Sequence, residues 1–164
     1  MPSSASPEIV QLLRIVDAAY DRRSWHGPNL RGSLRGVTPS QADWRPDPRR
    51  HNIRELTIHA AYWKYAAVRR LTGAKRGSFA LKGSNWFERT GKPTAAEWRE
   101  DLDLLEQCHR AFRAVVATLT PHELARTPPG AEFDIFGLVS GVAAHDLYHA
   151  GQVQLLKRMM EARG

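Results

Sequence analysis

Two histidines near the C-terminal end of the sequence, His145 and His149, have the spacing of a pair of metal ligands. Residues four apart lie on one side of an α-helix, so both rings can reach the same ion. At about 100° per residue, His149, Leu138 and Leu156 all fall within about 40° of His145. Both rings are therefore expected on the apolar side of the helix, where an unpaired polar group costs about 1–3 kcal/mol. A shared metal ion would meet that need, although a His-x-x-x-His pair is also common by chance.

A third ligand has to come from another helix, and His59 is the best candidate. It falls on the same side as Trp63, where it can flank the interior of a bundle. Three neutral imidazoles with one open position are typical of a catalytic metal site rather than a sealed structural one. The metal would lower the pKa of a bound water or thiol toward neutrality. The alternative for His59 is a half-buried histidine held by a hydrogen bond, and His109 is interpreted as a packing residue rather than a ligand.

Other chemistries have less support in the sequence. Asp146 gives a His-Asp-x-x-His pattern, one carbon short of the His-Glu-x-x-His of zinc peptidases, but no suitable downstream ligand follows. Cys108 is the only cysteine, cannot form an internal disulfide, and is expected to be a buried, unreactive thiol. No glycine-rich phosphate motif is present. Tyr148 and Gln152, like Asp146, adjoin the predicted ligands in sequence only, so the pattern assigns no proton donor.

Four stretches with helical periodicity must position these histidines, and none alternates with a period of two. Four helices without strands predict an all-α, four-helix bundle with long loops after the first and second helices. Asn52 and Glu55 give the second helix a capping pattern at its start. The predicted stretches are residues 7 to about 25, residues 52–71, residues 98–119 and residues from about 136 to the C-terminus.

The composition predicts one globular domain. The chain has 164 residues, of which 42% are hydrophobic and 25% charged, values typical of globular rather than disordered proteins. Residues 1–7 are interpreted as a short N-terminal tail and residues 8–164 as a single domain. No stretch approaches the roughly 20 apolar residues that span a bilayer, and no secretion signal is recognised at the N-terminus. We therefore expect a cytoplasmic protein without membrane partners.

The formal net charge of +7 is concentrated in residues 22–54 and 64–92, whereas residues 93–164 carry an acidic excess. Arg45, Arg49 and Arg50 form a predicted cationic rim that could attract a small acidic cofactor. The alternative is a non-enzymatic helical module that binds nucleic acid or a protein partner through its basic loops. No interleaved aromatic residues or recognition helix support nucleic-acid binding. A bundle that retains the histidines without turnover is a third possibility.

Two blocks of the sequence resemble the DinB-like superfamily of small four-helix metalloenzymes. This superfamily includes the bacillithiol transferases and the metal-binding domain of mycothiol-dependent maleylpyruvate isomerase. The first block runs from His51 through Leu56 to His59 and Trp63, and is similar to the family pattern H-S-I-x-E-L-x-x-H with Asn52 in place of Ser. The second block, residues 141–152, is similar to the pattern G-x-x-x-H-D-x-Y-H-x-G-Q.

The resemblance implies further properties. It implies an up-down-down-up bundle with a divalent ion, often nickel or zinc, held at the positions of His59, His145 and His149. Homodimers are frequent in the family, and characterised members transfer or add low-molecular-weight thiols. The leading hypothesis is therefore a metal-dependent enzyme of the thiol (S-) transferase type that acts on a small electrophile.

Overall fold

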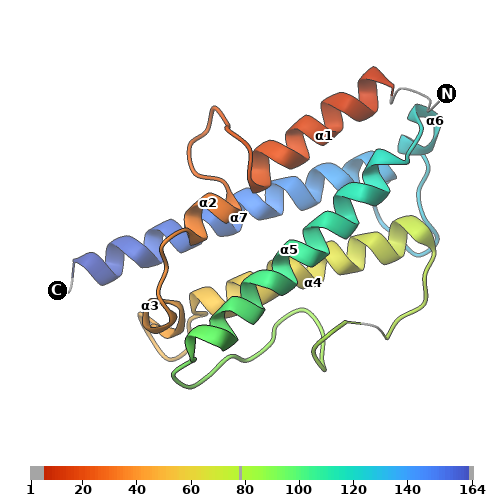
Figure 1. Cartoon of the computed structure of the whole chain (residues 1–164). Helices are drawn as coiled ribbons and strands as arrows, with labels where there is room; N and C mark the ends of the chain where they lie inside the picture. Colours follow the sequence, from red (N-terminus) through yellow and green to blue (C-terminus); the bar gives the residue numbers. More distant parts are fainter. Residues whose placement is uncertain (1–5, 78, 163–164) are drawn as a thin grey trace.

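The computed structural model describes residues 6–77 and 79–162, and all regular structure within them is helical. The described residues form four long helices and three short ones, whose arrangement is drawn in Figure 1. The all-α class predicted from the sequence is therefore confirmed. The predicted N-terminal tail lies mostly outside the described residues, and Pro7 already belongs to the first helix. The helices are α1 (Pro7–Tyr20), α2 (Leu30–Leu34), α3 (Pro39–Asp43), α4 (Ile53–Thr72), α5 (Ala95–Ala117), α6 (Pro121–Leu124) and α7 (Ile135–Glu161).

Each long helix begins at a polar side chain that accepts a hydrogen bond from a backbone N–H of the first turn. These N-caps satisfy amides that have no partner within the helix. Gly73, with a φ of 71°, ends α4 in the left-handed conformation that glycine adopts at low cost. The caps are Ser6 for α1, Asn52 for α4, Thr94 for α5 and Asp134 for α7.

The segment between α1 and α4 contains two short helices that the periodicity did not predict. In α3, Thr38 and Gln41 form a capping box, in which each side chain bonds the backbone N–H of the other residue. In α2, Leu30 is fully buried and packs in the same cluster as residues of α4 and α7. The long connection between α4 and α5, residues 73–94, contains no helix among its described residues.

The apolar core forms two clusters along the length of the bundle. The first includes Leu30, Leu56 and Leu105. The second includes Phe112 and Val139. Helix α4 packs against α5 and α7, and α1 packs against α7. Within the described residues, no helix combines the length and the apolar character needed to cross a bilayer.

The predicted ligands on α7 lie where the two apolar clusters meet. Ala143 belongs to the second cluster and Ala150 to the first. His145 and His149 occupy the stretch between them, so the bundle places two polar rings at the boundary between its apolar layers.

The start of α4 offers a test of the fold. The Asn52 side chain is fully buried; its Oδ1 accepts from the Glu55 N–H (2.8 Å), and its Nδ2 donates to the Arg89 carbonyl (2.9 Å). We expect Asn52→Ala to lower the free energy of unfolding by about 1–2 kcal/mol, because it removes the cap. Urea denaturation measures the loss. Asn52→Ser retains a capping oxygen and is expected to lose less; an equal loss in both variants would contradict this role of the cap.

Candidate metal centre

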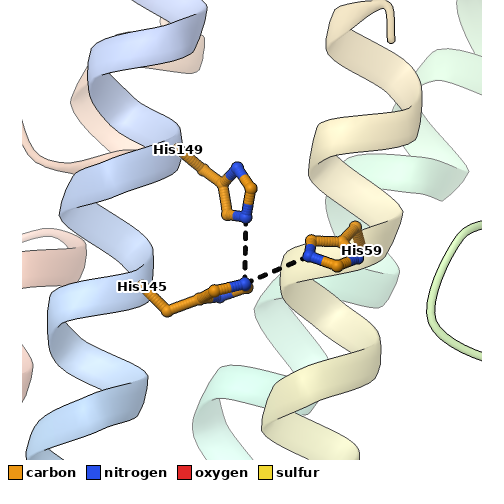
Figure 2. A group of neighbouring side chains, drawn as sticks. All are labelled: His59, His145 and His149. Atoms are coloured by element: carbon orange, nitrogen blue, oxygen red, sulfur yellow. Dashed lines mark hydrogen bonds between the residues drawn. The ribbon is translucent and has the colours of Figure 1, made fainter.

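Three histidine rings converge at the interface between α4 and α7 (Figure 2). His59 comes from α4, and His145 and His149 come from successive turns of α7. The Nε2 atom of His145 lies 3.1 Å from the Nε2 of His59 and 2.9 Å from the Nε2 of His149. Ligand nitrogens bound to one ion at about 2.0–2.1 Å are separated by roughly 2.9–3.4 Å. The structure thus brings together all three histidines predicted from the sequence, at distances compatible with one shared ion.

Hydrogen bonds on the outer side of the rings set which nitrogen carries the proton. The His59 Nδ1 lies 2.8 Å from the Asn85 carbonyl oxygen, which can only accept, so this nitrogen donates. The His149 Nδ1 lies 2.6 Å from the Oε1 of Gln152 and donates in the same way. In neutral rings both Nε2 atoms then carry lone pairs that face the cluster. Such outer partners are the usual means of orienting metal-bound histidines.

The resulting arrangement has one lone pair too many for hydrogen bonding alone. The His145 Nε2 faces the lone pairs of both His59 and His149, and a single N–H can satisfy only one of them. The His145 Nδ1 is buried without a hydrogen-bond partner. A cation between the three Nε2 atoms would satisfy all of them together, so the donor set fits a divalent metal ion of the kind that imidazole prefers.

Burial keeps the three rings in the form that binds metal. Desolvation, together with the neighbouring histidines, lowers the pKa of His145 to about 3 and the pKa of His149 to about 4. Desolvation also lowers the pKa of His59. All three imidazoles are therefore neutral near pH 7, and protons compete poorly for their lone pairs.

Aromatic rings of α4 and of the connection that follows it enclose the His59 side of the site. Trp86 stacks on His59 with ring centres 3.8 Å apart, and its other face stacks on His51 at 3.6 Å. Trp63 contacts His59 edge-on and donates from its Nε1 to the Asn85 Oδ1 at 3.0 Å. Asn85 has a φ of 62°, a left-handed conformation that few non-glycine residues other than Asn and Asp adopt readily. This local backbone aims the Asn85 carbonyl at the His59 ring.

The DinB superfamily model matches residues 23–153, a range that contains all three histidines and their outer partners. The chain belongs to the DinB superfamily. No curated protein and no solved structure matches it.

The three residues that adjoin the predicted ligands in sequence make different contacts in this DinB-superfamily protein. Gln152 holds the His149 ring, whereas Tyr148 is largely exposed and only touches that ring edge-on. Asp146 is buried and points at Lys64 of α4, with 2.5 Å between Oδ2 and Nζ. Asp146 therefore does not supply the candidate metal centre with the acidic group that zinc peptidases carry beside their histidine ligands.

The structure also shows the surroundings of His109, Cys108 and Arg45, which the sequence analysis singled out. His109 lies outside the cluster and stacks on Tyr20 with ring centres 3.5 Å apart, so its interpretation as a packing residue is confirmed. Cys108 is half-buried, and desolvation raises the pKa of its thiol to about 11, as expected of an unreactive cysteine. Arg45 corrects a prediction: it is bound by Glu55 through two nitrogens at 2.6 and 3.0 Å. Its charge is therefore engaged, because Glu55 is itself buried and needs a cation.

A cavity of about 460 Å³ lies beside the metal centre. One of its lining residues is Gln152, the partner of His149. The exposed Arg50 contributes positive charge, whereas Arg49 is paired with Asp47 of the same wall, with 3.2 Å between Nε and Oδ1. Leu155 and Met159 contribute an apolar wall. Of the three arginines of the predicted cationic rim, Arg45 and Arg49 are therefore bound to carboxylates, and Arg50 is what remains.

Metal loading tests the centre directly. We expect the protein, incubated with Ni²⁺ or Zn²⁺ and then desalted, to retain about one ion per chain by elemental analysis. His145→Ala/His149→Ala removes two of three ligands, so it should retain almost none while keeping the helical circular dichroism of the wild type. His109→Phe, which changes a buried histidine outside the cluster, serves as the matched control. Equal metal content in the double variant and the wild type would exclude the centre.

His109 also makes the folded state sensitive to acid. Desolvation, aided by the positive charges of Lys64, Arg113 and Arg31, lowers its pKa to about 3, whereas an unfolded chain titrates near the ordinary value. Below about pH 6.5 the unfolded state binds a proton that the folded state does not, so stability falls as the pH falls. We expect His109→Phe to reduce this slope by about 1.4 kcal/mol per pH unit between pH 4 and 6.

Urea denaturation of the metal-free wild type and of His109→Phe at several pH values measures the two slopes. The three histidines of the metal centre contribute equally to both proteins, so the difference isolates His109. Parallel curves would contradict the lowered pKa.

Proposed function

We propose that this DinB-superfamily protein is a divalent-metal-dependent enzyme that transfers a low-molecular-weight thiol to a small electrophile. The observation that carries the proposal is the convergence of three Nε2 lone pairs, held by outer hydrogen bonds, beside a cavity that carries positive charge. Nickel or zinc bound there would lower the pKa of a coordinated thiol and so supply a nucleophile at neutral pH.

The side chains around the centre support binding and orientation of such a substrate. Arg50 can attract a carboxylate on the thiol or on the electrophile, and Leu155 and Met159 can receive an apolar portion. His59 and His149 are 5% and 2% exposed, so the protein excludes water from most of the cluster. In the transfer, a bond forms between sulfur and carbon while the bond from that carbon to its leaving group breaks. The leaving group takes the electron pair, and the thiol proton passes to solvent.

We also infer the up-down-down-up topology for the four long helices. In Figure 1, α1 and α7 run from right to left, whereas α4 and α5 run from left to right. Pairwise contacts support the parallel course of α4 and α5. Arg54 of α4 contacts Asp101 of α5, and Lys64, further along α4, contacts Phe112, further along α5.

A conjugation assay tests the proposed activity. The nickel- or zinc-loaded protein is mixed with a chlorinated aromatic electrophile and a panel of small thiols, some with carboxylates and some without. We expect metal-dependent release of chloride that falls to the background rate in His145→Ala/His149→Ala, because those rings are needed to hold the ion. His109→Phe should retain the activity.

The same assay distinguishes the roles of charge and metal. Arg50→Glu should raise the KM for thiols that carry a carboxylate and leave the KM for uncharged thiols unchanged, because only the former would use the positive charge. Conjugation that survives removal of the metal would overturn the proposal. Metal binding without conjugation of any thiol in the panel would indicate a bundle that retains the histidines without this activity.

A further inference from the structure

A buried ion pair crosses the same helix interface as the metal centre. Lys64 of α4 and Asp146 of α7 have side chains only 1% and 2% exposed, with 2.5 Å between Nζ and Oδ2. The Lys64 ammonium also lies over the rings of Tyr20 of α1 (5.0 Å) and Phe112 of α5 (5.8 Å). Lys64 thus contacts one residue from each of the other three long helices.

Stability alone does not account for this pair. Removing two charges from water is costly, and apolar residues of similar volume often stabilise a core as well or better. The second carboxylate oxygen of Asp146, Oδ1, is buried without a hydrogen-bond partner, so the pair is not even fully satisfied. A directional polar contact can fix the register between two helices, whereas an apolar contact does not.

The pair lies where register matters for the metal centre. Asp146 directly follows His145 on α7, and Lys64 lies five residues after His59 on α4. Sliding α7 by one residue would move its rings by about 1.5 Å, whereas ligand distances tolerate only about 0.2 Å. The apolar contacts on either side are non-directional and resist such a displacement less sharply.

We propose that Lys64 and Asp146 are positioning residues, which fix the register of α7 against α4 so that the three histidine Nε2 atoms meet at one point. The proposal rests on the metal centre but not on the thiol chemistry. It goes beyond the ligands and their direct partners, because neither Lys64 nor Asp146 has a hydrogen bond to any of the three rings.

Replacing the pair by apolar residues separates positioning from stability. We expect Lys64→Met/Asp146→Leu to fold with a metal-free Tm equal to or above that of the wild type, because the cost of burying two charges is removed. Its affinity for Zn²⁺, measured by competition with a chromogenic chelator, should be about 10- to 100-fold lower. The absorption spectrum of the Co²⁺-loaded protein should also change, since it reports the coordination geometry.

A second variant keeps both charges. Asp146→Glu lengthens the pair by one methylene, so it should fold with a displaced register, bind Zn²⁺ roughly 10-fold more weakly and give an altered Co²⁺ spectrum. Arg54→Met is the matched control. Arg54 lies five residues before His59, pairs with Asp101 of α5 instead of α7, and leaves that carboxylate to Arg89. Its loss should lower the Tm without changing the Zn²⁺ affinity.

The outcomes distinguish this proposal from the metal centre itself. Wild-type Zn²⁺ affinity in a folded Lys64→Met/Asp146→Leu variant overturns the positioning role. If that variant does not fold, wild-type affinity and spectrum in Asp146→Glu overturn it. An equal loss of affinity in Arg54→Met would also overturn it, because any disturbed buried pair would then suffice. Absence of Zn²⁺ binding by the wild type would instead remove the metal centre, and with it both proposals.

Discussion

Three imidazoles can share one ion only if their lone pairs point to the same place, and this constraint governs the structure around α4 and α7. A free imidazole can carry its proton on either nitrogen. Here, the Asn85 carbonyl and the Gln152 side chain hold the outer nitrogens of His59 and His149, so the inner nitrogens are left as acceptors. Burial then keeps the rings neutral by lowering their pKa values. Ring orientation and charge state thus both depend on groups that lie outside the cluster of Nε2 atoms.

Different parts of the core make apolar contacts and directional polar contacts. The two apolar clusters supply non-directional burial, which drives folding. The polar groups between them are directional. Arg54 and Lys64 are placed symmetrically about His59 on α4, and each pairs with a carboxylate on a different neighbouring helix. Helix α4 is therefore held to α5 and to α7 by ion pairs on either side of His59.

The sequence was sufficient to single out the three histidines that the structure brings together, because helical periodicity gives the direction of each side chain. His145, His149 and His59 could be assigned to interior faces without knowledge of the loops, and the four long helices followed from the same pattern. Helices α2, α3 and α6 have five residues or fewer, too few to reveal a period of 3.6. The Thr38 and Gln41 capping pair was the available signal for α3.

Helical periodicity could not predict the contacts that irregular segments make. Asn85 and Trp86 lie in a connection with no periodicity, and the tolerance of Asn for left-handed backbone was the only local clue to its role. Arg45 was predicted to belong to a cationic rim, because nothing in the sequence shows that its segment folds back onto Glu55. The homodimer, the cytoplasmic location and the identity of the thiol stay predictions.

The Asn85 carbonyl couples the long connection between α4 and α5 to the candidate metal centre, because it accepts the hydrogen bond that selects the tautomer of His59. If the centre holds an ion as proposed, ordering of this connection and affinity for the ion form a thermodynamic cycle, and each strengthens the other by the same factor. Any contact that orders Trp86, which stacks on His59, would then raise that affinity without coordinating the ion. An irregular segment outside the helices would in this way share control of the centre with the helices that carry its histidines.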